Sequence, residues 1–167
     1  MRGFLVLAIL ASACHPLIAR AEHATITLSV LRSNPATGVS EEAASAGADQ
    51  EPPAGGNQQR EVVNVKANEP LALQFIFTNA YPHGVTKDVT IRFFVVRENK
   101  AGQKNLPDLT SGAVVQGQFQ LNFKPKGRVG ARVAFKVPEP GIYLLRVDSL
   151  NTQSDHEHFA ALDLRAE

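Results

Sequence analysis

From residue 61 to the end of the chain, apolar residues recur at every second position in short segments that turn-forming residues separate. The clearest segment carries Leu71, Leu73, Phe75 and Phe77. Side chains of a β-strand point alternately to opposite faces, so a period of two is typical of a strand with a buried face. No window places apolar residues at the 3.6-residue spacing of an amphipathic helix. The chain is therefore predicted to be all-β.

The same pattern predicts seven to eight strands. Alternating segments cover residues 24–32, 63–65, 71–78, 89–96, 115–123, 129–137, 142–149 and 156–164. Strands 63–65 and 71–78 flank the turn residues Asn68-Glu69-Pro70 and are predicted to form a hairpin. Segment 89–96 is apolar on both faces, which predicts a central strand. Short strands separated by regular turn signals are typical of an antiparallel sandwich or barrel.

Segment 115–123 has the cleanest division into two faces. One face carries an uncharged polar row, which consists of Gln116, Gln118, Gln120 and Asn122. This predicts a sheet face that is exposed to water. Two interpretations stay open: a simple hydrated face, or a face that pairs with a partner through hydrogen bonds.

Residues 34–60 differ in character from the rest of the chain. They include four Gly, three Pro and six Ala, no aromatic residue, and Val39 as the single branched aliphatic residue. Such a segment buries too little surface to offset the entropy of ordering it. A flexible loop or linker is predicted, which makes residues 22–33 an accessory strand to a domain over residues 61–167. The alternative is a functional surface insertion, because long loops inside compact domains are uncommon.

The N-terminus has the pattern of a secretory signal peptide. Arg2 precedes an apolar run over residues 4–13, and the small-residue triplet Ala19-Arg20-Ala21 predicts cleavage after residue 21. The run covers about half of the roughly 20 residues that a spanning helix needs, so no transmembrane anchor is predicted. Alternatively, Leu10-Ala11-Ser12-Ala13 before Cys14 resembles a bacterial lipoprotein box, which would acylate Cys14 and give a lipid anchor. Both interpretations predict an exported protein, periplasmic or extracellular.

Charge and cysteine content exclude several classes of protein. The full chain has 17 Lys and Arg against 16 Asp and Glu, and loss of Arg2 and Arg20 leaves 15 against 16, a net charge near −1. This balance provides no electrostatic footprint for nucleic acid or for an anionic membrane. Cys14 is the single cysteine, so the processed domain is expected to be stabilised by packing.

The segment Pro138-Glu139-Pro140-Gly141-Ile142-Tyr143-Leu144-Leu145-Arg146-Val147 resembles the PGxYxLxV stretch of many bacterial immunoglobulin-like and fibronectin-III-like domains. There the stretch enters the penultimate strand. The resemblance implies an antiparallel immunoglobulin-like sandwich over residues 61–167. It also implies a structural role for Tyr143, whose hydroxyl would bond back to the preceding loop. The chain departs from the pattern in having no Trp and no inter-sheet disulfide.

No motif of a common enzyme class is present. The sequence lacks GxSxG, HExxH, GxxxxGK[ST] and CxxC, and the domain over residues 61–167 offers no thiol nucleophile. The single pair of adjacent acidic residues, Glu41-Glu42, is interpreted as solvating. Sugar-binding faces present flat aromatic side chains, and the absence of Trp disfavours a lectin. A protein without enzymatic activity and without a cofactor is predicted, a hydrolase being the least favoured hypothesis.

Histidine forms the one constellation that suggests a ligand site. In an immunoglobulin-like sandwich, the loop with His83 and the loop before His156 project from the same pole. His156 and His158 are two residues apart on a strand, so they share a face. Imidazole groups suit Cu or Zn, which makes these three residues candidate metal ligands, with His23 as a further contributor. A polar surface and a pH-responsive partner interface are the alternatives.

The pole also carries a candidate contact with a partner. Tyr81 and Pro82 place a rigid aromatic surface beside His83, and such residues bind at low entropic cost. The sequence thus predicts an exported binding or structural accessory protein of the cell envelope, which contacts a protein partner through pole loops or an edge strand. The alternative is a periplasmic metal-binding protein that uses the histidine cluster.

Overall fold

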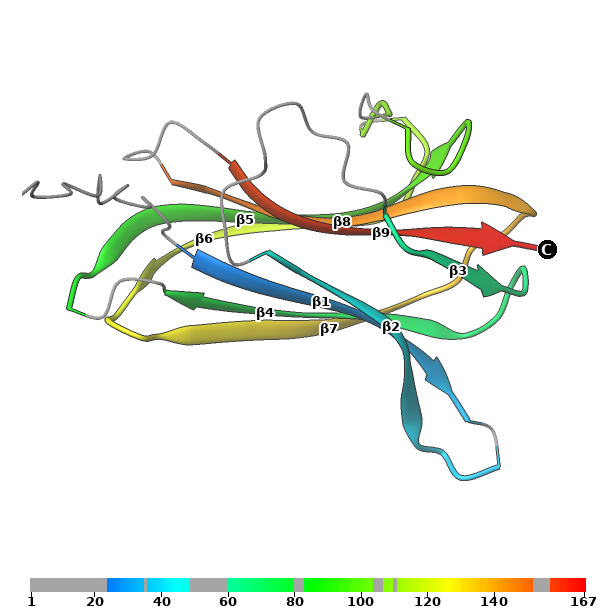
Figure 1. Cartoon of the computed structure of the whole chain (residues 1–167), viewed down its shortest axis with the longest axis horizontal. Helices are drawn as coiled ribbons and strands as arrows, with labels where there is room; N and C mark the ends of the chain where they lie inside the picture. Colours follow the sequence, from blue (N-terminus) through cyan, green and yellow to red (C-terminus); the bar gives the residue numbers. More distant parts are fainter. Residues whose placement is uncertain are drawn as a thin grey trace, which may run out of the picture.

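The computed structural model describes residues 24–34, 36–48, 60–79, 83–103, 107–109, 111–151 and 157–167. Nine strands lie in these ranges: β1 (Ala24–Ser33), β2 (Ser40–Ala48), β3 (Val62–Val65), β4 (Leu71–Asn79), β5 (Thr86–Glu98), β6 (Ala113–Phe123), β7 (Arg128–Phe135), β8 (Gly141–Asn151) and β9 (Glu157–Ala166). They form two sheets, β2-β1-β4-β7 and β3-β9-β8-β5-β6, that pack face to face (Figure 1). The predicted all-β sandwich is confirmed, with nine strands in place of seven to eight.

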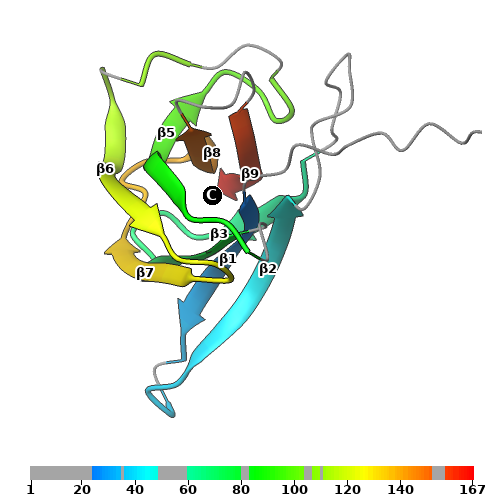
Figure 2. The ribbon, with the colours of Figure 1, turned by 90° about the vertical axis from the view of Figure 1, so that its left-hand side faces the viewer.

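The additional strand comes from residues 34–60. The prediction of a flexible linker is wrong over Ser40–Ala48, which pair antiparallel with β1 from Ser33↔Ser40 to Ile26↔Ala48. Ala and Ser side chains bury little surface, so β2 is held mainly by main-chain hydrogen bonds, which leave no alternation in the sequence. The end of this hairpin projects beyond the rest of the sandwich (Figures 1 and 2).

Strand β1 belongs to the domain itself. It lies between β2 and β4, and Ile26, Leu28 and Val30 are buried in the main core. The interpretation of residues 22–33 as an accessory strand is therefore wrong for the described part of that range. The domain therefore includes β1, because the first sheet would otherwise lack an inner strand.

Strands β3 and β4 do not form the predicted hairpin. Strand β3 pairs parallel with β9, from Val62↔Asp163 to Val65↔Ala166, whereas β4 pairs with β1 and β7 in the other sheet. The connection turns at Asn68, whose φ is +63° and whose N–H donates to the carbonyl of Val137 at 2.8 Å. Turn residues between two alternating segments therefore mark a crossing between sheets here.

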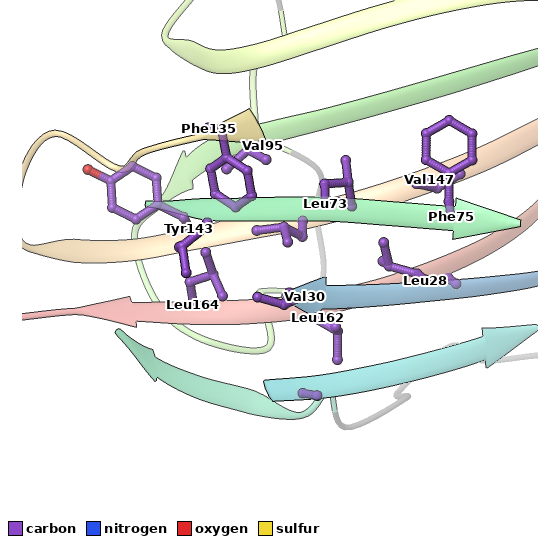
Figure 3. Close-up of a cluster of buried hydrophobic side chains, with 14 of the residues drawn as sticks. Leu28, Val30, Leu73, Phe75, Val95, Phe135, Tyr143, Val147, Leu162 and Leu164 are labelled. Atoms are coloured by element: carbon purple, nitrogen blue, oxygen red, sulfur yellow. The ribbon is translucent and has the colours of Figure 1, made fainter. Parts of the chain in front are cut away.

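The core between the sheets consists of the inward residues of the inner strands. Leu28, Leu73, Phe75 and Leu162 have no exposed surface, and Figure 3 shows such side chains converging from both sheets. The predicted central strand is confirmed, since β5 lies between β8 and β6. The hydroxyl of Tyr143 donates to the carbonyl of Glu139 at 2.9 Å, as its resemblance to the corner tyrosine implied.

Candidate functional site

Strand β6 is the edge of the five-stranded sheet. It pairs with β5 on one side, and in the described part of the chain no strand pairs with its other side (Figure 2). The predicted hydrated face is confirmed: the whole Gln116–Asn122 polar row is exposed. An edge strand presents a row of N–H and C=O groups to which another strand can bind.

The other three edge strands carry features that discourage pairing with another chain. Exposed glutamates Glu41 and Glu42 lie on β2, exposed arginines Arg128 and Arg132 lie on β7, and β3 has four residues. Charged side chains and short length are the usual protections of a sheet edge. Strand β6 has eleven residues, none of them charged and none of them proline. It is thus the long, uncharged edge among the described strands. Its one irregularity on the β6 side is a register shift against β5 at Val114, between the pairs Val95↔Val115 and Val96↔Ala113.

The inner side of β6 is incompletely covered. Glycine at position 117 leaves room for the ring of Phe93, since a Cβ atom there would lie 2.4 Å from that ring. The ring of Phe93 is tilted against that of Phe75, at 5.4 Å between centroids, and the ring of Phe119 is stacked with it at 6.4 Å. Six inward apolar residues of β6 and β7 are half-buried, unlike those of the inner strands: Val115, Phe119, Leu121, Val129, Ala131 and Val133. Phe123 and Phe135, at the ends of the two strands, are buried. Apolar surface therefore lies open along this side of the sandwich.

A groove of about 390 Å³ follows β6 on the outer face of the sheet. Its lining includes Gln116 and Gln118 of β6, Arg92 and Phe94 of β5, and Leu109 of the β5–β6 connection. The leucine also packs on the small outer cluster around Phe94. The groove gives the amide row a neighbouring surface with both polar and apolar character.

Buried polar residues hold the pole that carries His83. The Asn79 amide donates to the carbonyl of Gly84 at 2.9 Å and to that of Lys124 at 3.0 Å. The Thr86 hydroxyl donates to Asn79 Oδ1 at 3.0 Å. These bonds join the β4–β5 connection to the β6–β7 turn, and the side chain of His83 is exposed beside them.

The structure places the predicted metal ligands only in part. Val89 in β5 pairs with Asn151 at the end of β8, so the end of β8 lies at the same pole as the start of β5. The loop that follows Asn151 lies outside the described residues. His158 lies in β9, opposite Ser149, and His156 lies outside the described residues. Within those residues, no group of three or more His, Cys, Asp and Glu is placed to hold a metal ion. The metal site stays a prediction.

Other predicted features also fall outside the described residues. Tyr81 and Pro82, the predicted partner contacts, lie there, as do His23, Cys14 and the whole predicted signal peptide. No helix in the described ranges is long and apolar enough to span a membrane. Of the residues predicted to act at the pole, the structure therefore describes the surroundings of His83 and the backbone of His158.

A buried charged cluster that was not predicted from the sequence lies on the outer face of the five-stranded sheet. Arg60 Nε donates to Asp163 Oδ1 at 2.7 Å and its Nη2 donates to Glu98 Oε2 at 2.6 Å. Asp163 Oδ2 accepts from the N–H of Gly102 at 2.6 Å, where a φ of +69° favours glycine. The cluster ties the chain before β3 and the turn after β5 to strands β5 and β9.

Within this cluster, burial raises the pKa of Glu98 from 4.5 to about 7, against the opposing effect of the Arg60 guanidinium. Its Oε1 atom is buried and has no hydrogen-bond partner among the described residues. The Glu98 side chain has no exposed surface, so a substrate does not reach it in this conformation. We interpret the cluster as structural.

A second charged group lies beside it on the same face. Arg92 donates two bonds to Asp148, at 2.7 and 3.0 Å, and Arg146 donates to the same carboxylate at 3.2 Å. The Arg146 guanidinium lies 4.0 Å from the ring centre of Phe159. Alternating charged residues within apolar strands were the available sequence signal for both groups, but the pairing of these residues depends on the strand order.

Replacement of Glu98 by glutamine is expected to remove a pH dependence of stability. A carboxyl group whose pKa is higher in the folded than in the unfolded chain binds its proton more tightly when folded. Its stabilising contribution is therefore complete below about pH 4.5 and is lost as the pH rises to about 7. Urea unfolding across this range is expected to show a free energy that falls by a few kcal/mol in the parent chain and stays flatter in Glu98→Gln.

The matched control is Glu139→Gln, which removes an exposed carboxylate that pairs with Arg97. This variant is expected to retain the slope of the parent chain. Equal slopes in Glu98→Gln and the parent would show that another group causes the pH dependence.

Comparison with known proteins found no matching family model and no matching curated protein. Among solved structures, the chain is similar to a family 123 glycoside hydrolase from Clostridium perfringens, with 13% identity and a TM-score of 0.42 over 64% of this chain and 23% of that one. It is also similar to an AA10 lytic polysaccharide monooxygenase from Streptomyces lividans, with 12% identity and a TM-score of 0.36 over 68% and 62%. The chain thus spans under two thirds of either structure. These comparisons assign the chain to no family.

Proposed function

We propose that this protein is an exported, non-enzymatic binding module of the cell envelope that contacts its protein partner by strand addition at β6. The observation that carries the proposal is an eleven-residue edge strand without charge or proline. An edge of this kind binds extended chains readily, and natural proteins protect it unless it has an occupant. The fold belongs, in this proposal, to the immunoglobulin-like superfamily, which the Tyr143 corner bond supports.

The two sides of β6 specify the strand that it accepts. Alternate side chains of an added strand point to opposite faces of the sheet. One set would cover the half-buried apolar residues Val115, Phe119 and Leu121, and the other set would lie beside the amide row. An alternately apolar and polar segment therefore fits this edge, with main-chain hydrogen bonds providing the affinity.

Site-specific photo-crosslinking in cells that export the chain tests the proposal. A photoreactive residue at Gln118, on β6, is expected to give a discrete adduct with a protein. The same residue at Ser45, an exposed position on the protected edge β2, is the matched control and is expected to give none. Absence of an adduct from Gln118, or equal adducts from both positions, would contradict strand addition at β6.

A further inference from the structure

We infer that the strand bound by β6 is the β6 of a second copy of this chain, paired antiparallel about a two-fold axis. The inference rests on the proposed function, because it names the occupant of the same edge. Two-fold dimers are the commonest oligomers, and their interface must be complementary to itself. Strand β6 meets this requirement because it carries no charge that would repel its own copy. Its amide side chains can also pair with one another, and it is long enough to form several main-chain hydrogen bonds.

Pairing centred on Gln118 brings the regular part of β6 opposite its counterpart in the other copy, from Val115 opposite Leu121 to Leu121 opposite Val115. Val114 lies outside this overlap, because the register of β6 against β5 shifts there. Opposite residues of an antiparallel pair lie on the same face, so the polar rows of both copies become continuous. Gln118 then lies opposite its own counterpart, and Gln116 lies opposite Gln120. Amide groups both donate and accept hydrogen bonds, so each of these pairs is complementary without a charge.

The apolar face is complementary in the same register. Phe119 of one copy lies opposite Gly117 of the other, beside the Phe93 ring that covers that glycine. Val115 lies opposite Leu121, and both are half-buried in the single chain. Pairing therefore covers apolar surface along the side of the sandwich that the single chain leaves open.

Charge selects the antiparallel arrangement. Lys124, Lys126 and Arg128 follow β6 and are exposed. Antiparallel pairing puts the two basic turns at opposite ends of the joined strands, whereas parallel pairing would bring them together. The paired residues 115–121 give roughly seven main-chain hydrogen bonds, which is within the range of a typical protein interface. Both five-stranded sheets would then form one sheet of ten strands.

Sedimentation of the full chain tests this dimer. The parent chain is expected to sediment as a concentration-dependent dimer. The triple variant Gln116→Lys/Gln118→Lys/Gln120→Lys places three like-charged pairs across the two-fold axis, and its self-association is expected to be about a hundredfold weaker. The corresponding triple glutamate variant is expected to behave likewise. A mixture of the two variants is expected to recover the dimer, because every pair then becomes a salt bridge.

Recovery in the mixture also shows that both variants are folded, so loss of the dimer cannot be ascribed to unfolding. Ser45→Lys on β2 is the control with an added charge at another edge, and it is expected to remain dimeric. A dimer that persists in the triple lysine variant would place the interface elsewhere and overturn the inference. A monomeric parent chain would also overturn it.

The parent chain could be monomeric and still give an adduct from position 118 whose mass differs from that of a dimer of this chain. This result would support strand addition at β6, with a strand of another protein as the occupant. A monomeric parent chain without an adduct would contradict both proposals.

Discussion

Replacement of Arg60 by alanine is expected to lower the free energy of unfolding at neutral pH by about 3–5 kcal/mol, the range for breaking a buried ion pair. Arg60 has a side chain that is 13% exposed, and both of its carboxylate partners, Glu98 and Asp163, have no exposed surface. Removal of the guanidinium leaves two buried carboxyl groups near each other without a cation, of which Glu98 is only partly ionised at neutral pH. Urea unfolding of the full chain at pH 7 measures this loss.

The loss is expected to be smaller at low pH. Protonation of Glu98, whose pKa is already about 7 in the parent chain, removes one of the two uncompensated charges. Arg97→Ala is the matched control, because the ion pair of Arg97 with Glu139 joins side chains that are 54% and 66% exposed. Its expected cost is below about 1 kcal/mol. Similar losses of unfolding free energy in the two variants would show that burial of the Arg60 cluster adds nothing to the stability of the fold.

Replacement of Phe75 by alanine is expected to lower the free energy of unfolding by about 3–5 kcal/mol. Phe75 has no exposed surface and contacts the rings of Phe77, Phe93 and Phe119 from both sheets. Its removal leaves a cavity that the paired strands cannot close, because the main-chain hydrogen bonds fix their spacing. Thermal and urea unfolding both measure this effect.

Position 75 also affects β6, since Phe119 and the Phe93 ring over Gly117 pack against it. Phe75→Ala is therefore expected to weaken any association through β6 in addition to stability. Val39→Ala, at a position that is 59% exposed on the β1–β2 hairpin, is the control and is expected to change stability by less than about 0.5 kcal/mol. A loss below 1 kcal/mol in Phe75→Ala would mean that the core collapses around the missing ring.

The alternating pattern of the sequence indicates which side chains of a strand point inward. Alternation correctly indicated the all-β class, the central position of β5, and the hydrated row on β6. Resemblance indicated the corner bond of Tyr143. Each of these depends on neighbouring residues in the chain, because the two-residue period of a strand is a local property of the backbone.

Which strands are neighbours became clear from the three-dimensional arrangement. It turned Ser40–Ala48 into a strand, paired β3 with β9 in place of β4, and brought Arg60 to Glu98 and Asp163. It also left β6 at an edge. Strands pair through main-chain N–H and C=O groups, which every residue except proline carries alike, so the choice of neighbour leaves no local pattern in the sequence.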